Sequence, residues 1–369
     1  MQKNFLYLNF VPENEKGVLK KIKFQIKALE KLGITVERTE IKDNFFCWNN
    51  KMKKYYKYGE TILSKIKNKL DNFLIFSKLK NKNFYKNIDV IYLRYIGTTP
   101  WALLYYKLLK KIGKKIVIEI ATYPYDGEVK QENIFTKLDK KYRLELYKYI
   151  DKIVTYSNDQ KIWGIPCINI SNGIDLDEIK MVNKKEKKEE KIVFTSISTC
   201  AFWHGLDRFL YSFIEYKENG GINNIVLNII GEGKETPKLK KIVDENPILK
   251  ENVIFHGFKS GKELDDIYNE TDIAIGSLGI HRITGLKEVQ PLKNREYCAK
   301  GLPFIISFTD PNFVNKNFVY NNISNDDNIF SIEEIINWYK TLEIKPKEIR
   351  EYSKQFSWDI QMKKVIDNI

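Results

Sequence analysis

The sequence predicts an α/β protein made of two doubly wound domains, each with helices on both faces of a parallel sheet. Two observations support this prediction. Short apolar segments alternate with helical patterns through the first half of the chain, and the alternation restarts after a charged stretch. The length of 369 residues suffices for two domains, and 43% hydrophobic residues can fill two cores.

The first domain is expected over residues 1–176. Residues 4–10 have the pattern of a buried strand, followed by a loop with Gly17 and a helix that ends at Gly33. The helix is indicated by apolar residues at helical spacing, at Val18, Leu19, Ile22, Ile26 and Leu29. Further strand-like segments lie at residues 34–40, 89–95, 115–120, 152–157 and 167–171.

Residues 177–190 are mostly charged and are expected to form a linker. The second domain is expected over residues 191–343, with strands at 191–198, 225–230, 252–257, 272–276 and 303–307. Its helices are expected at residues 206–218, 237–244, 262–271 and 291–300. Residues 344–369 have helical apolar spacing in parts, and we expect this segment to pack back on the first domain.

The chain is basic, with a formal net charge of +14 and a pI near 9.2. Nearly all of the excess is lysine, whereas arginine is the commoner reader of nucleic-acid bases. No recognition helix or RNA-binding motif is evident. We therefore expect nucleotide sugars and anionic lipid as partners rather than nucleic acid.

The longest apolar runs, residues 73–76 and 225–230, are too short to cross a bilayer. The first ten residues resemble a strand rather than a signal peptide, so we expect a cytoplasmic chain, peripheral on the inner face of the membrane. The four cysteines and three histidines have no metal-ligand spacing, and no metal site is expected.

The most informative segment is a loop and helix at residues 285–303. Pro291 suits the first turn of a helix, and Gly301 suits its end. Lys287 and Lys293 lie near the start of this helix, where cations oppose the helix dipole. An anion such as phosphate is therefore expected there.

Two carboxylates, Glu288 and Glu296, flank this expected phosphate site. Because carboxylates repel phosphate, their expected partners are neutral hydroxyls, as on a sugar and a ribose. A nucleotide sugar supplies both the hydroxyls and the phosphate.

Several motifs recur in a characteristic order, and together they resemble the retaining GT-B glycosyltransferases of the large family 4 type. They are the Glu-x7-Glu pair of Glu288 and Glu296 and the segments at 172–175, 229–233, 253–257 and 356–359. A narrower resemblance, through residues 203–208 and 291–297, is to bacterial enzymes of surface-polysaccharide synthesis, such as capsule or lipopolysaccharide.

This resemblance implies a GT-B fold, with two Rossmann-like domains facing across a cleft. It implies a metal-independent, hexosyltransferase-like enzyme without a cofactor that retains anomeric configuration. The donor would be a nucleoside-diphosphate sugar in the second domain. The acceptor would be a glycan, lipid-linked in our interpretation, in the first domain.

The resemblance also implies roles for single residues. Glu288 would be the catalytic residue beside the transferred sugar, and Glu296 would bind the ribose hydroxyls. Amide groups around Leu292 and Lys293 would contact the distal phosphate. The loop at Gly17 would approach the diphosphate from the first domain.

The chain departs from the family pattern at the diphosphate. No arginine ends the strand at 191–198, and His204 stands where lysine is usual. We expect His204 or Arg208 to replace these groups. Arg282, Lys287 and Lys293 would add positive charge.

The acceptor side is less defined. Enzymes of this family often have a histidine near the reacting sugar in the first domain, but no histidine precedes His204 in this chain. The polar candidates there are Glu119, Tyr123, Tyr125, Asp126 and Glu128. Arg94, at the end of an apolar strand, has two interpretations that stay open: an acceptor contact or a buried ion pair.

Residues 51–86 combine many lysines with aromatic residues. They are interpreted either as a solvated helix pair or as a surface that docks on anionic lipid. The alternatives for the whole chain are a nucleotide-sugar epimerase of the same fold and a lysine-rich nucleic-acid-binding protein.

Overall fold

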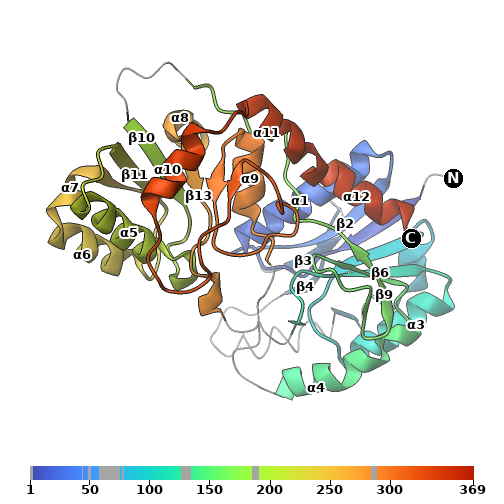
Figure 1. Cartoon of the computed structure of the whole chain (residues 1–369). Helices are drawn as coiled ribbons and strands as arrows, with labels where there is room; N and C mark the ends of the chain where they lie inside the picture. Colours follow the sequence, from blue (N-terminus) through green and yellow to red (C-terminus); the bar gives the residue numbers. More distant parts are fainter. Residues whose placement is uncertain are drawn as a thin grey trace. The chain divides into compact units, whose positions relative to one another are not determined.

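The computed structural model describes residues 3–43, 45–48, 51–57, 75–76, 79–125, 134–184, 191–283 and 289–369. The chain forms two compact units (Figure 1). Unit 1 comprises Met1–Gly173 and Trp358–Ile369, and unit 2 comprises Ile174–Ser357. Unit 2 is thus longer at both ends than the expected second domain, and only the last part of the 344–369 segment lies in unit 1.

Unit 1 is built on a sheet whose described strands have the order β4-β3-β2-β1-β5-β6-β7-β9-β8. The strands are β1 (Asn4–Leu8), β2 (Thr35–Lys42), β3 (Phe45–Trp48), β4 (Lys51–Lys57), β5 (Val90–Arg94), β6 (Lys115–Ile120), β7 (Lys152–Thr155), β8 (Lys161–Ile162) and β9 (Ile165–Asn169). From β2 to β9 the neighbours are parallel, whereas β3, β4 and β8 pair antiparallel at the two edges. The strand order reverses between β1 and β5, and in such sheets ligands bind beyond the carboxyl ends of the strands at this point.

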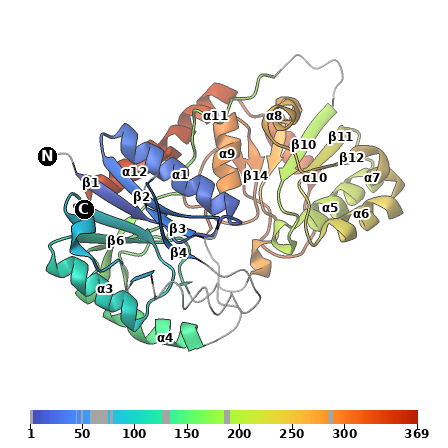
Figure 2. The ribbon, with the colours of Figure 1, turned by 180° about the vertical axis from the view of Figure 1, so that it is seen from behind.

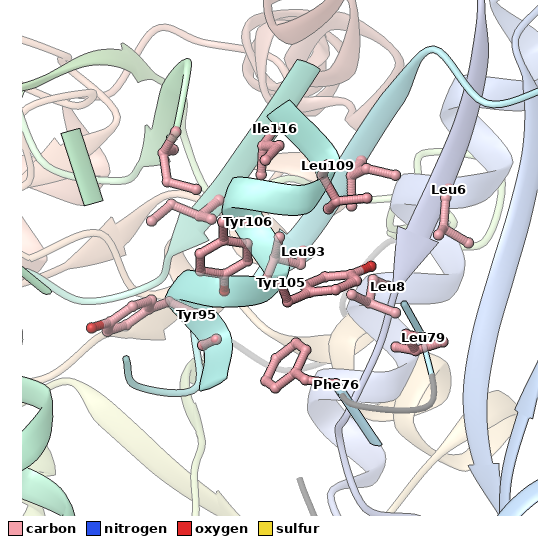
Figure 3. Close-up of a cluster of buried hydrophobic side chains, with 14 of the residues drawn as sticks. Leu6, Leu8, Phe76, Leu79, Leu93, Tyr95, Tyr105, Tyr106, Leu109 and Ile116 are labelled. Carbon is pink, nitrogen blue, oxygen red and sulfur yellow. The ribbon is translucent and has the colours of Figure 1, made fainter. Parts of the chain in front are cut away.

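Alternate side chains of these strands enter two different cores. Phe5 and Tyr7 pack on the face that also receives side chains of α1 (Lys16–Lys31) and α12 (Trp358–Asp367). Leu6 and Leu8 pack on the other face, under α3 (Pro100–Lys111). The inner side of α3 supplies Tyr105, Tyr106 and Leu109 to this core (Figure 3). The remaining described helices of unit 1 are η1 (Lys82–Tyr85), α4 (Ile134–Tyr142) and η3 (Arg143–Lys148).

Unit 2 is built on a parallel sheet with the order β12-β11-β10-β13-β14-β15. The strands are β10 (Lys191–Ile197), β11 (Asn224–Ile230), β12 (Val253–Gly257), β13 (Ile273–Ile275), β14 (Phe304–Ile305) and β15 (Val319–Tyr320). This is the strand order of the Rossmann fold, with its switch point between β10 and β13. The five expected strands are all found, and β15 is an additional edge strand.

Helices cover both faces of the second sheet (Figures 1 and 2). One core contains side chains of α5 (Leu206–Glu218), α6 (Thr236–Glu245), α7 (Pro247–Asn252) and α10 (Ile332–Lys340). The other contains side chains of α8 (Gly261–Glu270), α9 (Leu292–Lys300) and α11 (Pro346–Ser353). Short helical turns lie at η4 (Phe202–His204), η5 (Ile280–Arg282) and η6 (Lys354–Phe356).

Three local expectations are corrected. Gly17 lies in the first turn of α1 rather than in the preceding loop, because the chain already turns at Pro12–Glu15 and the helix begins at Lys16. Pro291 lies just before α9 rather than inside it. Residues 51–57 form a strand, not a helix.

None of the helices in the described part of the chain is both long enough and apolar enough to span a membrane.

Candidate active site

The candidate site of unit 2 lies at the carboxyl ends of β10 and β13. The loops that follow these strands touch backbone to backbone at Gly205. Its φ of +63° is left-handed, and a Cβ atom there would lie 2.5 Å from the carbonyl carbon of Leu278. The N–H of Leu278 donates to the carbonyl of His204 at 2.9 Å. The two loops therefore hold the His204 ring in place.

His204 is buried and is held as a neutral hydrogen-bond donor. The N–H of Ala201 donates to its Nδ1 at 2.9 Å, so the ring proton is placed on Nε2. Burial, and then the charge of Lys293, lower the pKa of His204 to about 3. The ring can thus offer an N–H to an anion without carrying a charge itself.

Lys293 lies in the first turn of α9, and its side chain ends in a buried amine. Among the described residues, Nζ of Lys293 has no hydrogen-bond partner. Burial lowers the pKa of this amine to about 7. The same helix start has no side-chain cap and no acidic residue in its first turn. The uncapped start of this helix and the amine of Lys293 are groups that can bind an anion.

A buried ion pair fixes the start of α9. Arg295 and Asp310 are fully buried and form a bidentate pair, with Nη2 of Arg295 donating to Oδ1 of Asp310 at 2.9 Å. Asn294 donates to the same carboxylate at 3.0 Å, and Arg295 also donates to the carbonyl of Pro291 at 3.3 Å. No local sequence signal links Asp310 to α9, so sequence reasoning missed it.

Glu296 lies one turn further along α9 and is partly buried. The hydroxyl of Tyr268, from α8, donates to its Oε1 at 3.2 Å. A carboxylate that accepts a hydrogen bond from a tyrosine can also accept hydrogen bonds from hydroxyls of a ligand.

The two arginines expected at the donor are bound to protein groups instead. Arg208 is buried and donates to the carbonyls of Asn328, Ser324 and Leu278. Arg282 pairs with both carboxylate oxygens of Asp207, at 3.0 and 3.2 Å. Both arginines therefore stabilise the loops that lie next to η4.

In unit 1, Glu119 lies inside a polar network. Its side chain is 1% exposed and accepts hydrogen bonds from Tyr92 and Gln25, both at 2.7 Å. Lys21 and Arg94 each lie 3.3 Å from its Oε1. Of the two interpretations of Arg94, the ion pair is the one observed. Burial raises the pKa of Glu119, but Lys21, Arg94 and the two hydrogen bonds outweigh this and lower it to about 2.

The other expected residues of unit 1 vary in their surroundings. Tyr123 and Tyr125 pack against the core, and Tyr125 also meets the ring of Tyr95 edge-on at 4.9 Å. Gly17 faces open space, because a side chain beginning at this position would meet no atom within 4 Å of its Cβ.

Four expected site residues lie outside the described residues: Asp126, Glu128, Lys287 and Glu288.

Residues 177–356 match the family described as glycosyl transferases group 1. This part of the chain is therefore similar to a group 1 glycosyltransferase domain. It coincides closely with unit 2 and contains His204, Lys293 and Glu296.

The chain is also similar to known proteins over more than residues 177–356. An uncharacterized 41.2 kDa protein from the cps region of Klebsiella pneumoniae is 22% identical over 266 residues, which is 65% of this chain and 68% of the relative. A glycosyltransferase structure from Rickettsia africae superposes with a TM-score of 0.66 at 14% identity, covering 99% of this chain and 97% of its own.

The E. coli trehalose-6-phosphate structure bound with UDP-2-fluoro glucose superposes with a TM-score of 0.62 at 12% identity, covering 99% and 98% of the two chains. The expected fold class, GT-B with two Rossmann-like domains, is confirmed.

Proposed function

We propose that this glycosyltransferase moves a sugar from a nucleoside-diphosphate sugar to a glycan acceptor, with retention of anomeric configuration and without a metal ion. Unit 2 would bind the donor, and unit 1 would bind the acceptor. The observation that carries the proposal is the buried amine of Lys293, which has no described partner and lies at the uncapped start of α9.

The diphosphate is the leaving group of this reaction and gains negative charge as the glycosidic bond breaks. Protonated Lys293, the Nε2–H of His204 and the first amides of α9 would stabilise this charge. These groups are already fixed by Gly205 and by the Arg295–Asp310 pair, so little reorganisation is needed when the bond breaks.

Glu296 would bind the ribose hydroxyls, with Tyr268 orienting its carboxylate. Glu288 would act beside the transferred sugar. Arg208 and Arg282 would be positioning residues, because their donors are bound to loop carbonyls and carboxylates.

Surface-polysaccharide synthesis is the setting that the Klebsiella relative from a cps region supports. The acceptor would then be a lipid-linked glycan at the inner face of the membrane. The basic character of the chain, with a net charge of +14, suits such an anionic surface.

The test is a thermal-shift screen with UDP, GDP, ADP and CMP at millimolar concentration. A ligand that binds the folded state raises the melting temperature by mass action. We expect a rise with one nucleotide, and we expect Lys293→Met and Glu296→Ala to abolish it. Lys250→Met, at an exposed lysine of α7, is the matched control. An unchanged shift in Lys293→Met would contradict the proposal.

A further inference from the structure

Unit 1 exposes a group of large apolar side chains in one part of its fold. They are Trp101, Leu104, Ile134, Leu144 and Tyr147, each between 46% and 68% exposed. All five lie on α3, α4 or η3. We call these three helices, with their exposed side chains, the α3–α4 surface. Both views show α3 and α4 as neighbours (Figures 1 and 2).

On α3 the exposed apolar residues share one side of the helix with lysines. Tyr105, Tyr106 and Leu109 face the core (Figure 3). Residues 101, 104, 107 and 111 follow at intervals of three and four, so Trp101, Leu104, Lys107 and Lys111 lie along the opposite side. The outer side of α3 is therefore apolar near the start of the helix and basic near its end.

The helix α4 and the following η3 repeat this arrangement. Ile134, Lys137, Lys141, Leu144 and Lys148 are all exposed and are spaced by three or four residues. Lysine and apolar side chains thus lie together on the outer side of this second helical segment.

The α3–α4 surface is mainly basic. Residues 100–111 and 134–148 contain eight basic residues and two acidic residues. Of the two acids, Asp139 is buried and accepts a hydrogen bond from Thr98 at 2.6 Å, and Glu145 pairs with Lys148 at 2.7 Å. Lys110 pairs with Asp151 at 2.5 Å, which leaves the other exposed lysines to set the potential.

We propose that the α3–α4 surface docks this enzyme on an anionic lipid bilayer. The apolar side chains would enter the interface, and the lysines would lie at the headgroups. The proposal deepens the proposed function and rests on it, because a lipid-linked acceptor is reached from the bilayer. Nucleic acid would use the lysines but would leave the five apolar side chains in water.

The position of α3 adds to this argument. It begins directly after the loop that follows β5, so Trp101 lies at the edge of the sheet where parallel sheets bind ligands. A bilayer on the α3–α4 surface would hold a lipid-linked acceptor near that edge. The earlier candidate for lipid docking, residues 51–86, lies largely outside the described residues.

The test is co-sedimentation of the full chain with vesicles of phosphatidylcholine alone or mixed with phosphatidylglycerol, at low and high salt. We expect binding only to the anionic vesicles. The variant Lys137→Gln/Lys141→Gln should bind about fivefold more weakly for each lysine removed. The variant Leu104→Ser/Leu144→Ser should also bind more weakly, and its loss should persist at high salt.

Matched controls come from unit 2, where Ile222 is 93% exposed. Ile222→Ser and Lys250→Gln should bind vesicles as the wild type does. The α3–α4 variants should keep the melting temperature of the wild type, which would show that unit 1 folds, and should keep the nucleotide thermal shift. Absent binding to anionic vesicles, binding unchanged in both double variants, or equal loss in the controls would overturn the docking proposal. If no nucleotide raises the melting temperature of the wild type, the result would instead contradict the proposed function alone.

Discussion

Both units bury ionisable side chains near the carboxyl edge of a parallel sheet, but Glu119 of unit 1 has partners, whereas Lys293 of unit 2 has none among the described residues. In unit 1, Glu119 is surrounded by two cations and two hydrogen-bond donors. In unit 2, the amine of Lys293 has no described partner, and the neutral His204 ring lies within reach of its charge. Removing one partner of a buried ion pair is costly, whereas a buried charge that already lacks a partner costs free energy that a ligand can offset. Lack of a partner, more than burial, marks a binding site.

The largest effect is expected from removing the charge at the centre of the paired cluster. Glu119→Gln leaves Lys21 and Arg94 without their carboxylate, and breaking a buried pair in this way costs about 3–5 kcal/mol. Urea unfolding should show this loss of stability. Glu30→Gln, at an exposed carboxylate of α1, should leave stability nearly unchanged.

The same cluster predicts a pH dependence. The pKa of Glu119 is lower in the folded chain than in the unfolded chain, so its stabilising effect is present above pH 4.5 and is lost as the pH falls toward 2. Glu119→Gln should lack this component of acid unfolding. An acid transition identical to that of the wild type would show that other groups dominate.

The next effect concerns the unpaired amine, and here stability and binding should move in opposite directions. Lys293→Met removes a buried polar group without a partner, so the ligand-free protein should gain about 1–3 kcal/mol. Nucleotide affinity should fall about 100-fold, because a buried contact to a charged group is lost. Calorimetry and urea unfolding measure the two changes. If Lys293→Met is less stable than the wild type and still binds nucleotide fully, the amine of Lys293 has a structural role like that of Glu119 and does not bind the ligand.

Nucleotide affinity should also depend on pH through Lys293. The amine has a pKa of about 7 in the ligand-free protein, and only its charged form attracts diphosphate. Above pH 7, affinity should therefore fall by up to about tenfold per pH unit. His204 stays neutral over this range, since its pKa is about 3. Calorimetric titrations from pH 6 to pH 9 should give a flat profile for Lys293→Met.

The smallest effect should come from the group that orients Glu296. Tyr268→Phe removes one hydrogen bond to this carboxylate and should weaken nucleotide binding by about 1 kcal/mol. Binding of inorganic pyrophosphate, which has no ribose, should not change. Equal weakening for both ligands would contradict a ribose contact at Glu296.

Much of the fold could be predicted because the signals are local. Apolar segments of strand length indicated the parallel strands of both sheets except β15. The antiparallel hairpin of β3 and β4 was missed, because its lysine-rich second strand has little apolar alternation. The edge strand β15 has two residues, too few for any periodic pattern.

The candidate site was predictable only in part. Lys293 was singled out because a lysine at a helix start is locally unfavourable, and its role in binding stays a prediction. Whether an arginine is free or bound depends on distant groups, which a sequence pattern does not reveal. Arg208 donates to the carbonyl of Asn328, 120 residues away, and Arg282 pairs with Asp207, 75 residues away. Both were therefore expected at the donor.

The final helix has a consequence for how the protein is made. The helix α12 supplies Trp358, Met362 and Val365 to the core that α1 also lines, and the ring of Trp358 fills the space beside Gly173. On the ribosome, every residue of unit 2 therefore emerges before unit 1 is complete. Unit 1 therefore begins to emerge first and is completed last. A chain that stops at Ser357 would leave the apolar side of α1 open, so a late stop codon would damage the earliest part of the protein.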